Sequence, residues 1–70
     1  MSRFAAARAR RVLAALERIG WREKRRTGSH RTLEREGWPD LVFAFHDAEE
    51  IGPKMLERMA KCSGLGPEDL

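Results

Sequence analysis

Apolar residues near the start of the chain recur at steps of three and four positions. Such steps bring side chains to one face of a helix and predict an amphipathic helix over roughly residues 3 to 19. Gly20 follows the last periodic residue, where glycine commonly adopts the left-handed conformation that ends a helix. Arg8 and Arg11 lie off this stripe and should face solvent, whereas the stripe consists of Ala5, Ala9, Val12, Leu13, Leu16 and Ile19.

The middle of the chain contains three segments that favour strands, separated by turn residues. Trp21 to Arg26 and His30 to Arg35 are joined by the turn Thr27-Gly28-Ser29, in which glycine permits a tight reversal. A second turn, Glu36-Gly37-Trp38-Pro39-Asp40, is marked by glycine and proline and leads into the apolar strand Leu41 to Phe45. We therefore expect a hairpin followed by a third strand.

Alternation along these strands assigns side chains to the two faces of a sheet. If Leu33 lies in the core, Arg31 and Arg35 lie on the core side and His30 is exposed on the opposite side. Either the long stems of these arginines reach an edge of the sheet, or the strand twists or bulges, and the pattern does not choose. In the third strand the core side is Leu41, Phe43 and Phe45, and the candidate face of His30 carries Val42, Ala44 and His46.

A second helix is predicted after Gly52-Pro53, because proline is well tolerated in the first turn of a helix. The helix should run to about Cys62 and end at Gly64. Its buried stripe is Met55, Leu56, Met59 and Ala60. The side that faces solvent carries a basic ridge of Lys54, Arg58 and Lys61.

The charge distribution favours a nucleic-acid partner. The chain has 70 residues, with 14 Lys and Arg against 11 Asp and Glu, and most of the positive charge lies in residues 1–35. A basic half is typical of a domain that binds nucleic acid, or less often an anionic membrane surface. The longest apolar run, Leu41 to Phe45, is far shorter than the roughly 20 residues that span a bilayer. We expect one domain over residues 1–70, without a membrane segment or an export signal.

The only cysteine, Cys62, has no partner for an internal disulfide. This fits the reducing cytoplasm, where such a residue is usually a small, partly buried apolar side chain. The chain shows no spacing of His, Cys, Asp or Glu that is typical of a metal site. We therefore expect a cytoplasmic protein without a metal or another cofactor.

The segment Arg25-Arg26-Thr27-Gly28-Ser29-His30-Arg31 concentrates the chemistry of the chain. Histidine can accept and donate protons near neutral pH, and guanidinium groups bind phosphate oxygens with paired donors. His30 is therefore a candidate catalytic residue, and the alternative is a solvent-exposed strand histidine without a function. His46 is a candidate second acid or base, and the alternative is an imidazole that bonds to a backbone carbonyl. The candidate substrate-binding residues, which could equally form an ordinary solvated surface, are Gly28, Ser29, Lys24, Arg25, Arg26, Arg31, Lys54 and Arg58.

The order of these pieces resembles the HicA family of small bacterial toxins. The resemblance rests on Gly20-Trp21 after a helix, Gly28-Ser29-His30 at the start of a strand, the apolar strand Val42 to His46, and the run from Ile51 to Ser63-Gly64-Leu65. It implies a double-stranded-RNA-binding-domain-like α-β-β-β-α fold, with a three-stranded antiparallel sheet and two helices on one face. It also implies metal-independent mRNA cleavage with His30 as the catalytic residue, and inhibition by a HicB-type antitoxin. The chain departs from the family at Lys54-Met55, where HicA proteins usually have Gly-Thr.

Three function hypotheses follow. The leading one is the toxin of a type II toxin–antitoxin system, an mRNA endonuclease with no small-molecule ligand. The first rival is a non-catalytic RNA-binding module, which the basic ridge on the last helix equally allows. The second rival is a protein-interaction domain whose basic face binds an acidic partner. Trp38 could stack on a base or a partner, or simply cover the end of a hairpin.

Overall fold

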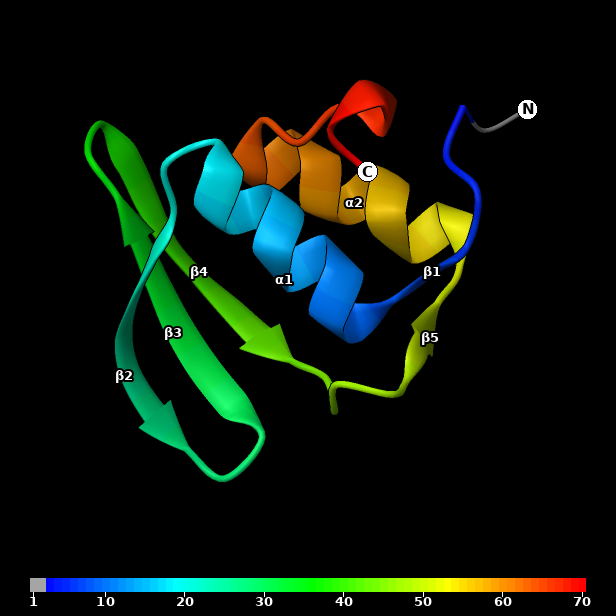
Figure 1. The fold of residues 1–70 in the computed structure, drawn as a ribbon. Coiled ribbons are helices and arrows are strands. Elements are labelled where there is room, and N and C mark those ends of the chain that lie inside the picture. Colours follow the sequence, from blue (N-terminus) through cyan, green and yellow to red (C-terminus); the bar gives the residue numbers. More distant parts are fainter. Residues whose placement is uncertain (1–2) are drawn as a thin grey trace.

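A computed structural model describes residues 3–70 of the chain. Its main elements follow the predicted order α-β-β-β-α, and Figure 1 shows both helices on the same side of the sheet. Their bounds are Ala9–Arg18 for α1, Arg22–Thr27 for β2, His30–Arg35 for β3, Trp38–Ala44 for β4 and Pro53–Ser63 for α2. The chain therefore has the predicted α+β fold, and a short 3₁₀ helix at Pro67–Asp69 follows it.

Helix α1 begins later than predicted. Ala7–Arg8 form the short strand β1, which pairs antiparallel with β5 at Glu50–Ile51. The amide of Ala9, the first residue of α1, donates to the carbonyl of Glu49 at 2.7 Å. The first amides of a helix have no acceptor within the helix, and this carbonyl supplies one. Because alanine is compatible with strand, loop and helix, the spacing of the apolar residues predicted a helix that begins earlier than α1 does. Ala5, a member of the predicted stripe, is exposed and lies outside the helix.

The three main strands form an antiparallel sheet in the order β2-β3-β4, so β2 and β4 are its edges. The turn Gly28-Ser29 joins β2 to β3 as predicted. Strand β4 begins at Trp38, earlier than predicted, and only Glu36-Gly37 remains as a turn. Pro39 is compatible with β4 because proline is accepted in edge strands, where one side of the backbone has no neighbour.

The core lies between the helices and one face of the sheet. Trp21 anchors it, because its indole Nε1–H donates to the carbonyl of Ser63 at 3.0 Å. This bond joins the residue that precedes β2 to the last turn of α2. The hydroxyl of Ser63 in turn donates to the carbonyl of Met59 at 2.6 Å, within α2. The largest apolar side chains that are fully buried are Trp21, Phe43, Leu16, Leu33, Ile51, Leu56 and Val12.

The prediction that Arg31 and Arg35 lie on the core side of β3 is confirmed. Arg31 is only 9% exposed, beside the fully buried Leu33. Arg35 is half-buried, and its Nη1 donates to the carbonyl of Ser63 at 3.1 Å. Of the two alternatives left open by the pattern, the irregular strand occurs, because the β3–β4 register shifts between Leu33 and Arg35.

Candidate functional site

His30 is exposed on the face of the sheet that the helices leave open. It is the first residue of β3, and its cross-strand partners are Thr27 on β2 and Ala44 on β4. Directly opposed residues of an antiparallel pair project to the same face. Gly28 in the preceding turn has a φ of 60°, and no atom lies within 4 Å of the position that a Cβ would occupy. The imidazole therefore stands at the end of a hairpin, next to a turn and a small alanine.

Arg25 is the basic side chain that the register places nearest His30 on this open face. Arg25 opposes Thr32, and in a regular ladder such a diagonal neighbour of His30 lies about 7–8 Å away. None of the ion pairs among residues 3–70 involves Arg25. Its charge is therefore available to an anion that approaches His30.

The acids of the open face lie toward the opposite end of the sheet, where they are paired. Arg22 lies 3.7 Å from Glu34, and Lys24 donates to the carboxylate of Asp40 at 3.0 Å. Lys24 was predicted to bind substrate, but its ammonium group is held by Asp40 in this structure. The open face is consequently basic at the His30 end and closer to neutral at the other end.

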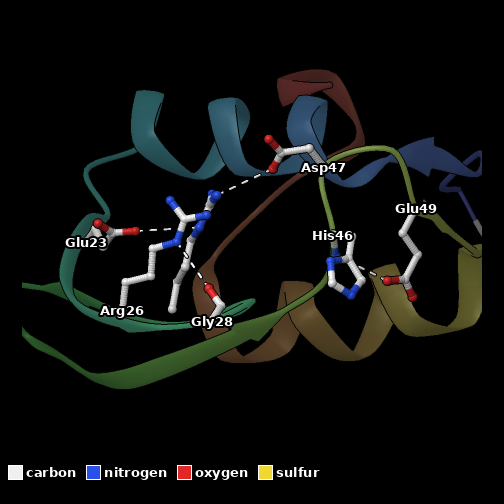
Figure 2. A network of polar contacts seen from close by, with 7 residues as sticks. Glu23, Arg26, Gly28, His46, Asp47 and Glu49 are labelled. Atoms are coloured by element: carbon white, nitrogen blue, oxygen red, sulfur yellow. Dashed lines mark hydrogen bonds and ion pairs between the residues drawn. The ribbon is translucent and has the colours of Figure 1, made fainter.

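Arg26 and Arg31 oppose each other across β2 and β3 and project to the helix side of the sheet. The Nε–H of Arg26 donates to the carbonyl of Gly28 at 3.2 Å (Figure 2). Arg31 lies 3.5 Å from Glu23 and 3.4 Å from Asp47. Neither acid was predicted as a partner of Arg31. Asp47 and Arg31 are far apart in the chain, and no spacing rule relates them. The structure therefore separates these two candidate substrate-binding residues from His30.

A hollow of about 370 Å³ lies on this side, and its lining includes Arg26, Ser29, Arg31 and His46 but not His30. Strand β4 ends at Ala44, so the alternation that assigned His46 to the face of His30 does not extend to it. The backbone amide of His46 donates to the carboxylate of Glu49 at 3.2 Å (Figure 2), and none of the hydrogen bonds in residues 3–70 involves its imidazole. His46 thus lines a hollow whose lining does not include His30.

The basic ridge of α2 lies on the helix side of the molecule. Lys54, Arg58 and Lys61 are exposed, and no ion pair among the described residues involves them. Arg58 lines a groove along β4 that also includes Val42 and Ala44. This second basic surface is therefore separated from His30 by the width of β4.

Trp38 packs against the end of a hairpin, and Cys62 lies at the surface. Trp38 packs edge to face against Trp21 with ring centroids 6.1 Å apart, and the guanidinium of Arg35 lies 5.0 Å from its ring. Trp38 thus covers the hairpin end opposite His30. Cys62 is exposed, whereas the sequence predicted a partly buried residue, because it falls on the solvent side of α2.

Residues 3–70 contain no cluster of three His, Cys, Asp or Glu side chains suited to a metal ion. None of their helices has the length and apolar character needed to cross a membrane.

Comparison with known proteins identifies the family of this chain. No curated protein and no solved structure gave a significant match. A family model described as the HicA toxin of bacterial toxin–antitoxin systems matches residues 9–65. The matched span begins with α1 and ends just after α2, so it includes the sheet, both helices and the hairpin that carries His30. The chain therefore belongs to the HicA toxin family.

Proposed function

We propose that this HicA toxin is an mRNA endonuclease in which His30 carries the proton transfers and Arg25 binds the phosphate. The observation that carries the proposal is the position of His30, an exposed imidazole on the open face with an unpaired arginine on the same face. A long RNA can reach this face because no helix covers it (Figure 1). The family supports toxin function in general.

The proposed reaction is a phosphoryl transfer within the RNA chain. His30 accepts the proton of a ribose 2′-hydroxyl, the oxygen attacks the adjacent phosphorus, and the bond to the 5′-oxygen breaks. The leaving oxygen takes a proton from the imidazolium or from water, which gives a 2′,3′-cyclic phosphate and a 5′-hydroxyl end. Arg25 offsets the charge that grows on the phosphate oxygens. Because imidazole and guanidinium supply both functions, the proposed reaction is metal-independent, and it requires RNA because DNA lacks the 2′-hydroxyl.

We further propose that the toxin acts on mRNA in the cytoplasm and is inhibited there by a HicB-type antitoxin that covers His30. A non-catalytic RNA-binding module is the second candidate function. It is favoured by one observation, the unpaired ridge Lys54, Arg58 and Lys61, which binds phosphates without needing a histidine.

Cleavage of a long single-stranded RNA in low salt and excess EDTA separates the two functions. We expect the wild-type protein to cut, and His30→Ala to cut about 10²–10⁴-fold more slowly. Circular dichroism should show that the His30→Ala protein is folded, since the side chain is exposed. If both proteins bind the RNA equally and neither cuts, the catalytic proposal is wrong and the binding module replaces it.

A further inference from the structure

Strand β4 has one edge without a neighbour. It is the last strand of the sheet, and among residues 3–70 its backbone pairs only with β3. A free edge presents a row of amide and carbonyl groups that can pair with another chain, and proteins usually protect it. The other edge, β2, is protected by charge, because it reads Arg-Glu-Lys-Arg-Arg-Thr and every residue in it is exposed. In β4 only the start is protected, by Pro39 and Asp40, so Leu41 to Ala44 remain open.

An apolar groove runs along this open edge. Its volume is about 250 Å³, and its lining includes Val42, Ala44 and Phe45 from the strand side and Met55, Arg58 and Met59 from α2. Val42 is 60% exposed and Met55 is 41% exposed, so two large apolar side chains of the groove are in contact with water. The groove therefore combines unpaired backbone groups with apolar side chains that gain from being covered.

Charge indicates what covers the groove. Arg58 lies in its wall, Lys54 and Lys61 are one turn away on α2, and no acid pairs with them among the described residues. An extended peptide with apolar residues for the groove and carboxylates for these cations satisfies every feature of this surface. RNA would pair with the cations but not with the backbone edge, and its charged backbone would lie against Val42 and Met55.

We propose that an extended segment of the antitoxin, with alternating apolar and acidic residues, adds a fourth strand to the sheet along Leu41 to Ala44 of β4. Ala44 is the cross-strand partner of His30. Neighbouring strands lie about 4.7–4.9 Å apart, so the added strand lies about two strand spacings from β3. On the open face, the small Ala44 is the residue of β4 that lies between the added strand and the imidazole. Docking at the edge thus places the antitoxin next to the face that carries His30. Inhibition by this docking rests on the catalytic role proposed above, whereas the docking itself does not.

A capped synthetic peptide of alternating valine and glutamate tests the edge by NMR on the full chain. We expect it to shift the amide signals of residues 41–44 and 55–59 and to slow hydrogen exchange at residues 41–44. Arg58→Glu should weaken binding at least tenfold. Arg10→Glu, the same charge change at an exposed position of α1, should not. A peptide of the same sequence with alternate backbone amides methylated should not bind, because it cannot complete the ladder.

The proposal is wrong if no shift occurs at about 1 mM peptide, if the shifts map to another surface, or if the methylated peptide binds equally well. It is also wrong if a single-stranded RNA displaces the peptide and shifts the same amides, since the groove then binds nucleic acid. RNA cleavage by the same protein without peptide is measured in parallel. If this protein does not cleave RNA, the catalytic role of His30 is contradicted. The docking proposal is unaffected by that result, because peptide docking is read from the amide signals.

Discussion

His30 and Ala44 are cross-strand partners in the antiparallel pair of β3 and β4. The next pair along the ladder, Arg31 with Phe43, projects to the helix side, where both residues are buried. One hairpin therefore presents an exposed imidazole on one face and a buried guanidinium on the other. This division separates the residues of the Arg25–Arg31 segment that are proposed to act on a substrate from a residue that is buried in the fold.

His46→Ala should leave RNA cleavage within about threefold of wild type, because His46 lies past the end of β4 and lines the hollow on the helix side. A general acid or base contributes about 10²–10⁴-fold, so its loss would be plain. The initial rate of RNA cleavage under single-turnover conditions checks this. A fall comparable to that of His30→Ala would assign the second proton transfer to His46.

Arg25→Ala should weaken RNA binding and reduce the dependence of affinity on salt. One lost phosphate contact lowers the slope of log K against log salt by about 0.7 for a single strand. Arg22→Ala is the matched control, because Arg22 is already paired with Glu34 at 3.7 Å. Fluorescence anisotropy with a labelled RNA at several salt concentrations measures both slopes. Equal slopes for the two variants would show that the unpaired state of Arg25 has no functional meaning.

The ion pairs of Arg31 predict an asymmetric effect on stability. Its side chain is 11% exposed, whereas those of Glu23 and Asp47 are 46% and 64% exposed. Removing the acids leaves a buried charge unpaired, while removing the arginine leaves two carboxylates that water can solvate. We expect Glu23→Gln with Asp47→Asn to lower the free energy of unfolding by about 1–3 kcal/mol.

Arg31→Met should cost less than about 1 kcal/mol, because it keeps most of the buried volume. It also removes an Nε–H that lies 3.5 Å from Glu23 but makes no hydrogen bond among residues 3–70. Urea denaturation of the three proteins gives the comparison. A larger cost for Arg31→Met than for the double variant would contradict the asymmetry.

Trp21→Phe should lower the free energy of unfolding by about 1–3 kcal/mol, through lost apolar volume and the lost indole bond to Ser63. In a chain of this size each kcal/mol lowers the Tm by about 4–8 °C. Trp38→Phe should lower the free energy of unfolding by less. Trp38 is 37% exposed, and its indole N–H donates no hydrogen bond among residues 3–70. Thermal unfolding followed by circular dichroism ranks the two variants, and the reverse order would refute the anchoring role of Trp21.

Gly64→Ala should destabilise the fold by about 1–3 kcal/mol, because Gly64 has a φ of 77° and an added Cβ would lie 3.0 Å from the ring of Trp38. Gly52→Ala is the control, since no atom lies within 4 Å of its Cβ position and its φ is −76°. Chemical denaturation should show a change of less than about 1 kcal/mol for the control, which reflects only that alanine is a poorer N-cap of α2 than glycine. Similar values for both variants would mean that the C-terminal cap of α2 relaxes freely.

The hairpin and the second helix were predictable because their signals are local. A glycine turn between two polar segments, and proline followed by an apolar stripe, depend on residues that are near each other in the chain. The exposure of His30 followed in the same way from alternation with Leu33. Where the backbone left a regular element, as at His46 beyond the end of β4, alternation no longer applies.

The boundary of α1, the partners of Arg31 and the open edge of β4 were decided by tertiary structure. β1 forms because Ala7 pairs with Ile51, which is distant in the chain, and the pairing of β4 with β3 brings Asp47 close to Arg31. No period or spacing encodes such contacts, since they depend on where separate elements pack. The sequence by itself determined the order of elements, the basic hairpin and the exposed histidine. Only the tertiary structure decided which basic residues share a face with that histidine, because the register between strands assigns each side chain to one face or the other.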